Sequence, residues 1–171
     1  MITLCCTRFN TQTWDENKRW RENKKYTGCL YTTPVKIKSS IPLLTTIIVI
    51  EMQNDYNKIL GIGLVSNYIH TKEICKVYND GNYNRYVYKS LYRIDEIEFN
   101  TEERKYINIL EPLLFKGSRH CKRGQGITSI PLWIANNSHF DFIHFIKKMF
   151  HERFSKTLDS NMFIETERID E

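Results

Sequence analysis

The sequence predicts an α+β domain in which a small, twisted, mainly antiparallel sheet closes toward a β-barrel and carries flanking helices. Three observations predict this class. Segments rich in β-branched residues outnumber helical ones and follow one another in hairpin order. Residues 138–154 repeat apolar side chains at helical spacing, as do residues 107–114. Gly61 and Gly63 share one face of a predicted strand, where missing side chains let a sheet coil or another group approach.

The first half of the chain begins with MITLCCTRF, residues 1–9, which is apolar and β-prone enough for a buried strand. Residues 13–26 are a predicted short helix, because acidic side chains come early in this segment and lysines come late. Residues 41–53 and 58–69 are both strand-like, and the turn residues NDYN separate them. These two segments predict a β-hairpin centred on residues 54–57.

The second half of the chain continues, after a dense turn signal, with residues 85–94, whose alternation predicts a further strand. A helix over residues 100–115 follows. Asn100 or Thr101 is its predicted N-cap, and Pro112 is expected to bend or end it because proline lacks a backbone N–H.

The C-terminal part contains an extended segment over residues 126–134 and a helix over residues 138–154, with Ser138 as its expected N-cap. No linker or change of composition interrupts residues 1–158, so we expect them to form a single globular domain. Residues 159–171 are then an acidic C-terminal tail.

The charge is distributed unevenly along the chain. The formal net charge is +5, but residues 159–171 hold five acidic residues and one arginine, so residues 1–158 carry +9. A basic body of this kind attracts polyanions such as nucleic acid through long-range electrostatics.

From the sequence we expect neither a membrane protein nor a secreted one. The longest apolar stretch is shorter than the roughly 20 residues that span a bilayer, so no membrane association is expected. The N-terminus does not read as a signal peptide, and five cysteines without C-x-x-C spacing are expected to be reduced thiols. We therefore expect an intracellular protein, not a secreted one. Ile, Lys, Asn and Tyr make up 60 of 171 residues, a composition typical of an AT-rich genome such as that of a large DNA virus, so the cytoplasm or nucleus of an infected host is included.

A basic loop follows the helix over residues 100–115. It places four cations within eight residues and has no acidic residue: Lys116, Arg119, Lys122 and Arg123. Flanking glycines free backbone N–H groups to face a bound anion. The loop is not a nucleotide-binding P-loop, because Gln125 follows Gly124 where that motif requires Lys. It is either a phosphate-contacting loop or a solvated connector.

Two further segments interleave cations and aromatic rings. In the predicted strand over residues 85–94, Tyr86 and Tyr88 share one face and Arg85 lies on the other. Among the cations and rings of the N-terminal helical segment are Trp14, Lys18, Arg19, Trp20 and Arg21. The four rings are candidates for stacking on bases and the cations for contacting phosphates. The alternative for both segments is that the rings pack into the core.

Catalytic and metal-binding patterns are weak in this sequence. The histidines of the last predicted helix lack the spacing of H-E-x-x-H, so we expect no metal site there, no cofactor and no catalytic residues. Glu51, at the end of the first strand of the predicted hairpin, and Asp55, in its turn, resemble the carboxylates of a metal-dependent nuclease.

Three stretches carry a resemblance to a known family: MITLCC…W…N…YTGCLY, the hairpin IIVIEMQNDYNKILGIGLVSNY, and GQGITSIP. Together they resemble the PUA-like superfamily, particularly its EVE and ASCH branches, over residues 1–134. KILGIGLVSN is the most specific piece, similar to a strand written xGxGxV in those domains. The resemblance implies a small pseudobarrel with flanking helices that binds RNA or modified DNA bases in an aromatic pocket between the barrel and a helix.

The sequence-based hypothesis is a nucleic-acid-binding module, for RNA or DNA. Two alternatives remain open. One is a small enzyme, either a nuclease that uses Glu51 and Asp55 with a divalent ion or a hydrolase that uses a lysine and a carboxylate. The other is a viral structural or assembly protein whose basic surface meets another protein or a packaged genome.

Overall fold

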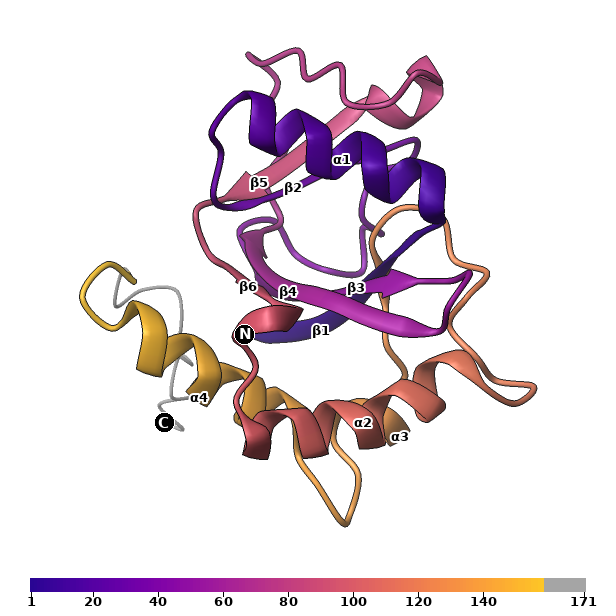
Figure 1. Ribbon diagram of the computed structural model, residues 1–171, viewed down its shortest axis with the longest axis vertical. Helices are drawn as coiled ribbons and strands as arrows, with labels where there is room; N and C mark the ends of the chain where they lie inside the picture. Colours follow the sequence, from indigo (N-terminus) through magenta and orange to yellow (C-terminus); the bar gives the residue numbers. More distant parts are fainter. Residues whose placement is uncertain (159–171) are drawn as a thin grey trace, which may run out of the picture.

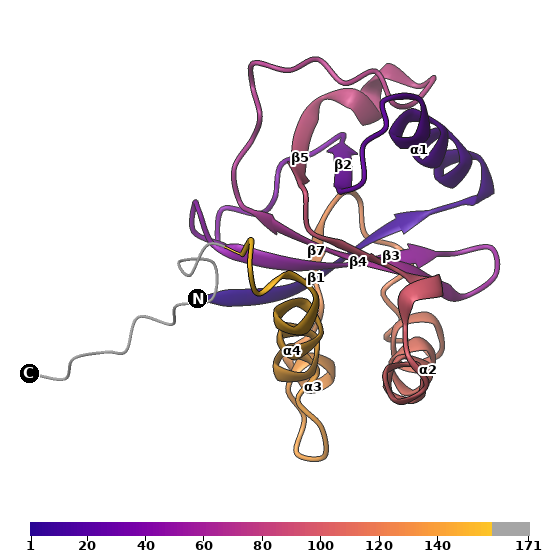
Figure 2. The same cartoon turned by 60° about the vertical axis from the view of Figure 1, so that its left-hand side comes forward.

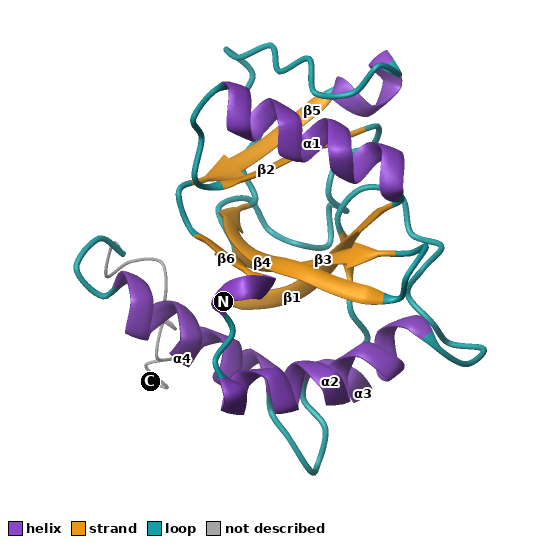
Figure 3. Ribbon diagram, in the orientation of Figure 1, coloured by secondary structure: helices purple, strands orange, loops and turns teal. Residues whose placement is uncertain are grey.

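The computed structural model describes residues 1–158, and its strands form two sheets (Figure 1, Figure 3). The larger sheet has five strands in the order β6-β4-β3-β1-β7, and the smaller one pairs β2 with β5. The strands are β1 Ile2–Phe9, β2 Cys29–Thr33, β3 Thr46–Gln53, β4 Lys58–Ser66, β5 Tyr86–Ser90, β6 Arg93–Asp95 and β7 Thr128–Ser129. The helices are α1 Thr11–Asn23, α2 Thr101–Phe115, α3 Leu132–Ala135 and α4 Phe142–Phe154, with short 3-10 turns η1 Gly81–Asn84 and η2 Glu96–Glu98.

Strand pairing confirms the α+β class and the mainly antiparallel character of the sheet. Four of the five pairings are antiparallel, and only β1 and β3 run parallel. A parallel pair needs a long crossover, and the chain supplies one through α1 and β2. The expected closure into a barrel is wrong for the described residues, because the two sheets are not hydrogen-bonded into one.

The five-stranded sheet separates two layers (Figure 2). Helices α2, α3 and α4 cover one face, and α1 with the small β2–β5 sheet covers the other. Neighbouring residues of β3 serve both layers: Ile48 packs on the helical side and Val49 under the small sheet. This double burial explains why β3 is an almost unbroken apolar run.

The predicted hairpin is confirmed as β3 and β4, joined by a turn at residues 54–57. Its two glycines allow close approach, as expected. A Cβ atom at Gly63 would lie 2.1 Å from the Tyr31 hydroxyl, and one at Gly61 would lie 2.7 Å from both Arg93 and Glu51. The small sheet and a buried ion pair therefore occupy the space that these glycines leave.

The predicted strand over residues 85–94 is wrong as a single element. Its first part is β5, which pairs with β2, and its last part is β6, which pairs with β4. The chain passes from one sheet to the other at Leu91, which is 67% exposed. An alternating pattern does not reveal this change of partner, because both halves have the same period.

Several element boundaries also differ from expectation. Helix α2 begins at its predicted cap, Asn100, but continues through Pro112 to Phe115. Helix α4 is capped by Asp141, whose side chain accepts a hydrogen bond from the His144 amide, and not by Ser138. The extended segment over residues 126–134 shortens to the two residues of β7 before α3 begins.

Within residues 1–158, no helix has the length and apolar character that a membrane crossing requires. The predicted acidic tail, residues 159–171, lies outside the described residues.

Candidate nucleic-acid interface

A small cavity of about 50 Å³ lies where the end of β1, the start of α1 and strand β2 meet. Thr7 and Phe9 of β1, Thr13 of α1 and Thr32 of β2 are among its lining residues, and the end of the basic loop lines it as well. We call this space the β2 cavity.

Strand β2 offers an unpaired backbone edge to this cavity. The Asn17 side chain donates a hydrogen bond of 2.9 Å to the Leu30 carbonyl oxygen, which therefore points away from β5. Backbone groups of a strand alternate in direction, so the N–H and C=O of Thr32 point to the same open edge. Thr32 thus presents one backbone donor and one backbone acceptor at the cavity.

The Thr32 side chain carries an unsatisfied group close to this edge, behind the wall of the cavity. Its hydroxyl oxygen is buried and has no hydrogen-bond partner among residues 1–158. The neighbouring Thr33 hydroxyl, in contrast, donates to the Val35 carbonyl at 2.7 Å. A buried hydroxyl without a partner costs roughly 1–3 kcal/mol, so a bound group that reaches it when the wall of the cavity moves would recover this energy.

Aromatic side chains stand at one side of the β2 cavity. The Tyr78 hydroxyl accepts a hydrogen bond from Asn17 at 3.2 Å, and burial raises its pKa above the ordinary value. Tyr83 packs edge-on against Tyr78, with ring centroids 6.1 Å apart, and remains 37% exposed. Tyr83 is therefore the lining ring with the most freedom to meet a ligand.

The basic loop is anchored beside the cavity through Lys122. Its carbonyl oxygen accepts hydrogen bonds from Arg8 at 3.3 Å and from Asn54 at 3.0 Å, and its ammonium group donates to Asn57 at 2.7 Å. These contacts tie the loop to β1 and to the β3–β4 turn, and the orange loop follows this path in Figure 1. Lys122 is thus a positioning residue as well as a cation.

The other three loop cations, Lys116, Arg119 and Arg123, are exposed and have no ion-pair partner within the described part of the chain. Exposed Arg8 also lines the cavity. At the end of the loop, Gly126 has a φ of +68°, and a Cβ there would lie 3.2 Å from the Thr33 Cβ. Glycine therefore lets the loop turn sharply against β2.

The other sequence-predicted residues are distributed over different parts of the molecule. Trp14, Lys18 and Arg21 line a separate cleft beside α1, and Arg19 is exposed on the same helix. Arg85 and Tyr86 line a hollow on the small sheet, where the Lys36 ammonium lies 5.5 Å from the Tyr86 ring centroid.

Two of the four predicted stacking rings pack into the interior. Tyr88 is 1% exposed and its hydroxyl accepts a hydrogen bond from the Ile37 amide, so its ring presents no face to a base. Trp20 packs edge-on against Tyr26 at 6.2 Å and contacts the core between α1 and the small sheet. These two rings therefore follow the alternative prediction, that they pack into the core.

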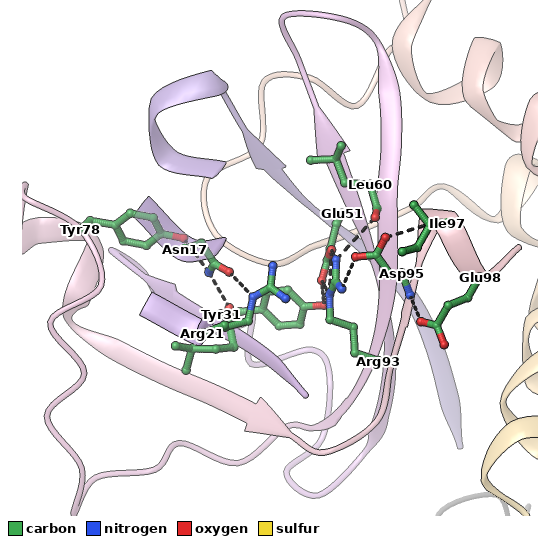
Figure 4. A network of polar contacts seen from close by, with 11 residues as sticks. Asn17, Arg21, Tyr31, Glu51, Leu60, Tyr78, Arg93, Asp95, Ile97 and Glu98 are labelled. Atoms are coloured by element: carbon green, nitrogen blue, oxygen red, sulfur yellow. Dashed lines mark hydrogen bonds and ion pairs between the residues drawn. The ribbon is translucent and has the colours of Figure 1, made fainter. Parts of the chain in front are cut away.

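The two carboxylates considered for a nuclease are held by different partners. Both oxygens of Glu51 accept hydrogen bonds from Arg93, and Tyr31 also donates to this group (Figure 4). Asp55 accepts two bonds from Thr11, and these bonds lower the pKa of the Asp55 carboxyl. Residues 1–158 contain no cluster of three or more side chains suited to hold a metal ion.

Sequence reasoning missed Arg8, Thr32, Tyr83 and Gln125 as neighbours of one cavity. Only Thr32 had a local signal in the sequence. It lies shortly before Pro34, and proline is confined to the edges and ends of strands, which indicates a strand edge here. The other three are brought together by contacts between segments that are distant in the sequence.

No family model, curated protein or solved structure matches this chain.

Proposed function

We propose that this protein binds nucleic acid, holding the edge of one unpaired base at the β2 cavity while the basic loop contacts the phosphate backbone. The observation that carries this proposal is Thr32, which lines the cavity on the edge of β2 that faces away from β5 and whose buried hydroxyl has no partner among residues 1–158. We further propose that the domain is PUA-like, because its candidate site lies between a sheet and a helix, as the resemblance implies.

The chemistry of the cavity suits a base edge. A nucleobase edge presents hydrogen-bond donors and acceptors side by side, and Thr32 offers both from its backbone together with a hydroxyl. Unpaired bases expose these edges and one ring face, and aromatic side chains bind that face by stacking. Tyr83 is the ring placed to do so.

The size of the cavity sets a requirement on binding. A base is larger than a space of about 50 Å³, so part of the wall must move. Gln125 and Tyr83 are exposed and line the cavity, and their displacement breaks no hydrogen bond that their side chains make to residues 1–158. The wall formed by these two side chains can therefore open without disturbing the sheets.

Phosphate contacts are assigned to the exposed cations next to the cavity, Arg8 and Arg123, with Arg119 further along the loop. Such contacts release counterions, so affinity must fall as salt concentration rises.

Fluorescence anisotropy with labelled single-stranded RNA and DNA homopolymers tests the phosphate assignment. We expect Arg123→Gln to weaken binding to all of them and to lower the salt slope by about one. The matched control is Lys105→Gln, which removes the same charge from the exposed surface of α2. Absence of binding to every homopolymer at low salt, or equal losses in both variants, would refute the proposal.

A second variant tests the base-binding role separately. Thr32→Val removes the unsatisfied hydroxyl at nearly constant shape, and we expect it to change the ratio of affinities among the homopolymers while leaving the salt slope intact. Thr71→Val, at an exposed position, is its control. An unchanged ratio in Thr32→Val would remove the hydroxyl from the site.

A further inference from the structure

Helix α1 has a second cleft on its other flank. Thr13 lines the β2 cavity and Asn17 bonds to β2, whereas Trp14, Lys18 and Arg21 line a cleft of about 510 Å³. Positions 14, 18 and 21 lie on one face of a helix because they are three or four residues apart. The opposite wall comes from β4, β6 and η2. We call this space the Arg21 cleft.

Arg21 is a buried cation whose hydrogen-bonding capacity is mostly unused. The residue is only 9% exposed, and its Nε donates to the Asn17 side chain at 2.9 Å. Its two Nη atoms have no hydrogen-bond partner among residues 1–158. Neither is among the solvent-shielded polar atoms that lack a partner, so both reach the open space of the cleft.

The nearby carboxylates are already occupied by another arginine. Both Glu51 oxygens accept from Arg93, and the Asp95 oxygens accept from Arg93 and from the Ile97 amide. Figure 4 shows Arg21 beside this group, joined by a dashed line to Asn17 alone. Burial and the neighbouring Arg93 lower the pKa of Arg21 by more than the nearby Glu51 and Asp95 raise it.

The two Nη atoms of Arg21, which have no partner within the described residues, are spaced to bind two oxygens of one anion. Nη1 and Nη2 form a planar fork that binds phosphate or carboxylate at two points. The Trp14 ring, whose centroid is 5.3 Å from the Arg21 guanidinium carbon, braces its orientation. Lys18 and Lys25 stand exposed at the rim of the cleft.

We propose that the Arg21 cleft is an anion site, separate from the β2 cavity, that binds a phosphate group through the Arg21 fork. The charged lining residues balance one another: Lys18, Arg21, Lys25, Glu22, Asp95 and Glu96. Recognition therefore depends on short-range hydrogen bonds at Arg21 and not on a strong positive field. Binding here should depend on salt less steeply than the proposed binding of polynucleotides.

Titration of the protein with inorganic phosphate tests this site, with tryptophan fluorescence and the melting temperature as readouts. We expect a saturable change in fluorescence, because Trp14 touches Arg21, and a rise in melting temperature with phosphate concentration. Arg21→Gln should weaken phosphate binding about tenfold or more, since hydrogen bonds to charged groups are lost. The matched control is Arg19→Gln, the same change at an exposed position of α1.

A second ligand identifies the source of the phosphate, and a second variant separates loss of binding from misfolding. A nucleoside 5′-monophosphate that binds more tightly than inorganic phosphate assigns the cleft to a nucleotide terminus, and equal affinities assign it to free phosphate. Arg21→Lys keeps the charge but not the fork, so it should also bind weakly. No saturable signal in the unmodified protein, or equal losses in Arg19→Gln, overturns the proposal. Neither result bears on the Arg123→Gln experiment, which reports on the basic loop.

Discussion

Arg93 holds Glu51 in a two-point ion pair inside the protein, with Nε 3.0 Å from Oε1 and Nη2 2.7 Å from Oε2. Their side chains are only 4% and 3% exposed. Tyr31 donates to the same carboxylate at 2.8 Å, so the pair connects β3 and β6 of the large sheet with β2 of the small one (Figure 4). Burial opposes the charge on Arg93, but Glu51 and Asp95 together more than offset this and raise the Arg93 pKa.

Replacing Arg93 by methionine should destabilise the protein strongly. The substitution leaves the Glu51 carboxylate buried without its partner, which typically costs about 3–5 kcal/mol. Urea unfolding followed by circular dichroism measures the change. The double variant Glu51→Leu/Arg93→Met removes both charges and should be less destabilised than Arg93→Met alone. If the single variant proves the more stable of the two, the pairing does not carry this energy.

Adding one methyl group at Gly63 should also destabilise the protein. Its Cβ would lie 2.1 Å from the Tyr31 hydroxyl, so the small sheet would have to move away from β4. We expect Gly63→Ala to lower the free energy of unfolding by about 1–3 kcal/mol, as overpacking does. Gly81→Ala is the control, because no atom lies within 4 Å of its added Cβ. Equal stabilities of the two variants would contradict this close packing.

Cys121 should be the most reactive of the five thiols near neutral pH. Its pKa is lowered to about 7 because the Cys6 thiol donates a hydrogen bond to it, whereas burial raises the pKa of Cys5 to about 12. The thiolate is the reactive form. Alkylation by iodoacetamide, followed by mass spectrometry, should therefore label Cys121 first, with a rate that levels off above its pKa.

Removing the donor provides the matched test of this assignment. In Cys6→Ala the Cys121 pKa should rise toward its ordinary value of 9.0, and alkylation near neutral pH should slow. Reaction of Cys121 with the same pH profile in both proteins would show that Cys6 does not set its pKa.

Local signals allowed part of the fold to be predicted. The hairpin was visible because two β-branched segments flank the turn residues NDYN, and α2 because a cap residue, Asn100 or Thr101, precedes apolar residues at helical spacing. Both signals act over a few residues, so they hold in almost any tertiary context. The split of residues 85–94 into β5 and β6 had no such signal, because it depends on which strand each half meets.

The candidate site shows the same division. Composition alone identified the basic loop, since four cations without an acid stand out in any context. The neighbours of that loop could not be inferred, because Arg8 and Lys122 meet across 114 positions of sequence. Tyr88 was a candidate for stacking on bases, with core packing as the alternative, and its pairing opposite Tyr31 places it between the two sheets.

The sequence by itself determined the α+β class, the hairpin with its two glycines, and a basic domain body with one dense cationic loop. These follow from period, turn chemistry and charge, which are properties of short segments. Only the tertiary structure decided that β2 leaves an open edge at Thr32 and that Glu51 pairs with Arg93. It also decided that the two Nη atoms of Arg21 stay without a hydrogen-bond partner among residues 1–158. Each of these depends on the partner a side chain meets, and the partner is set by how distant segments pack.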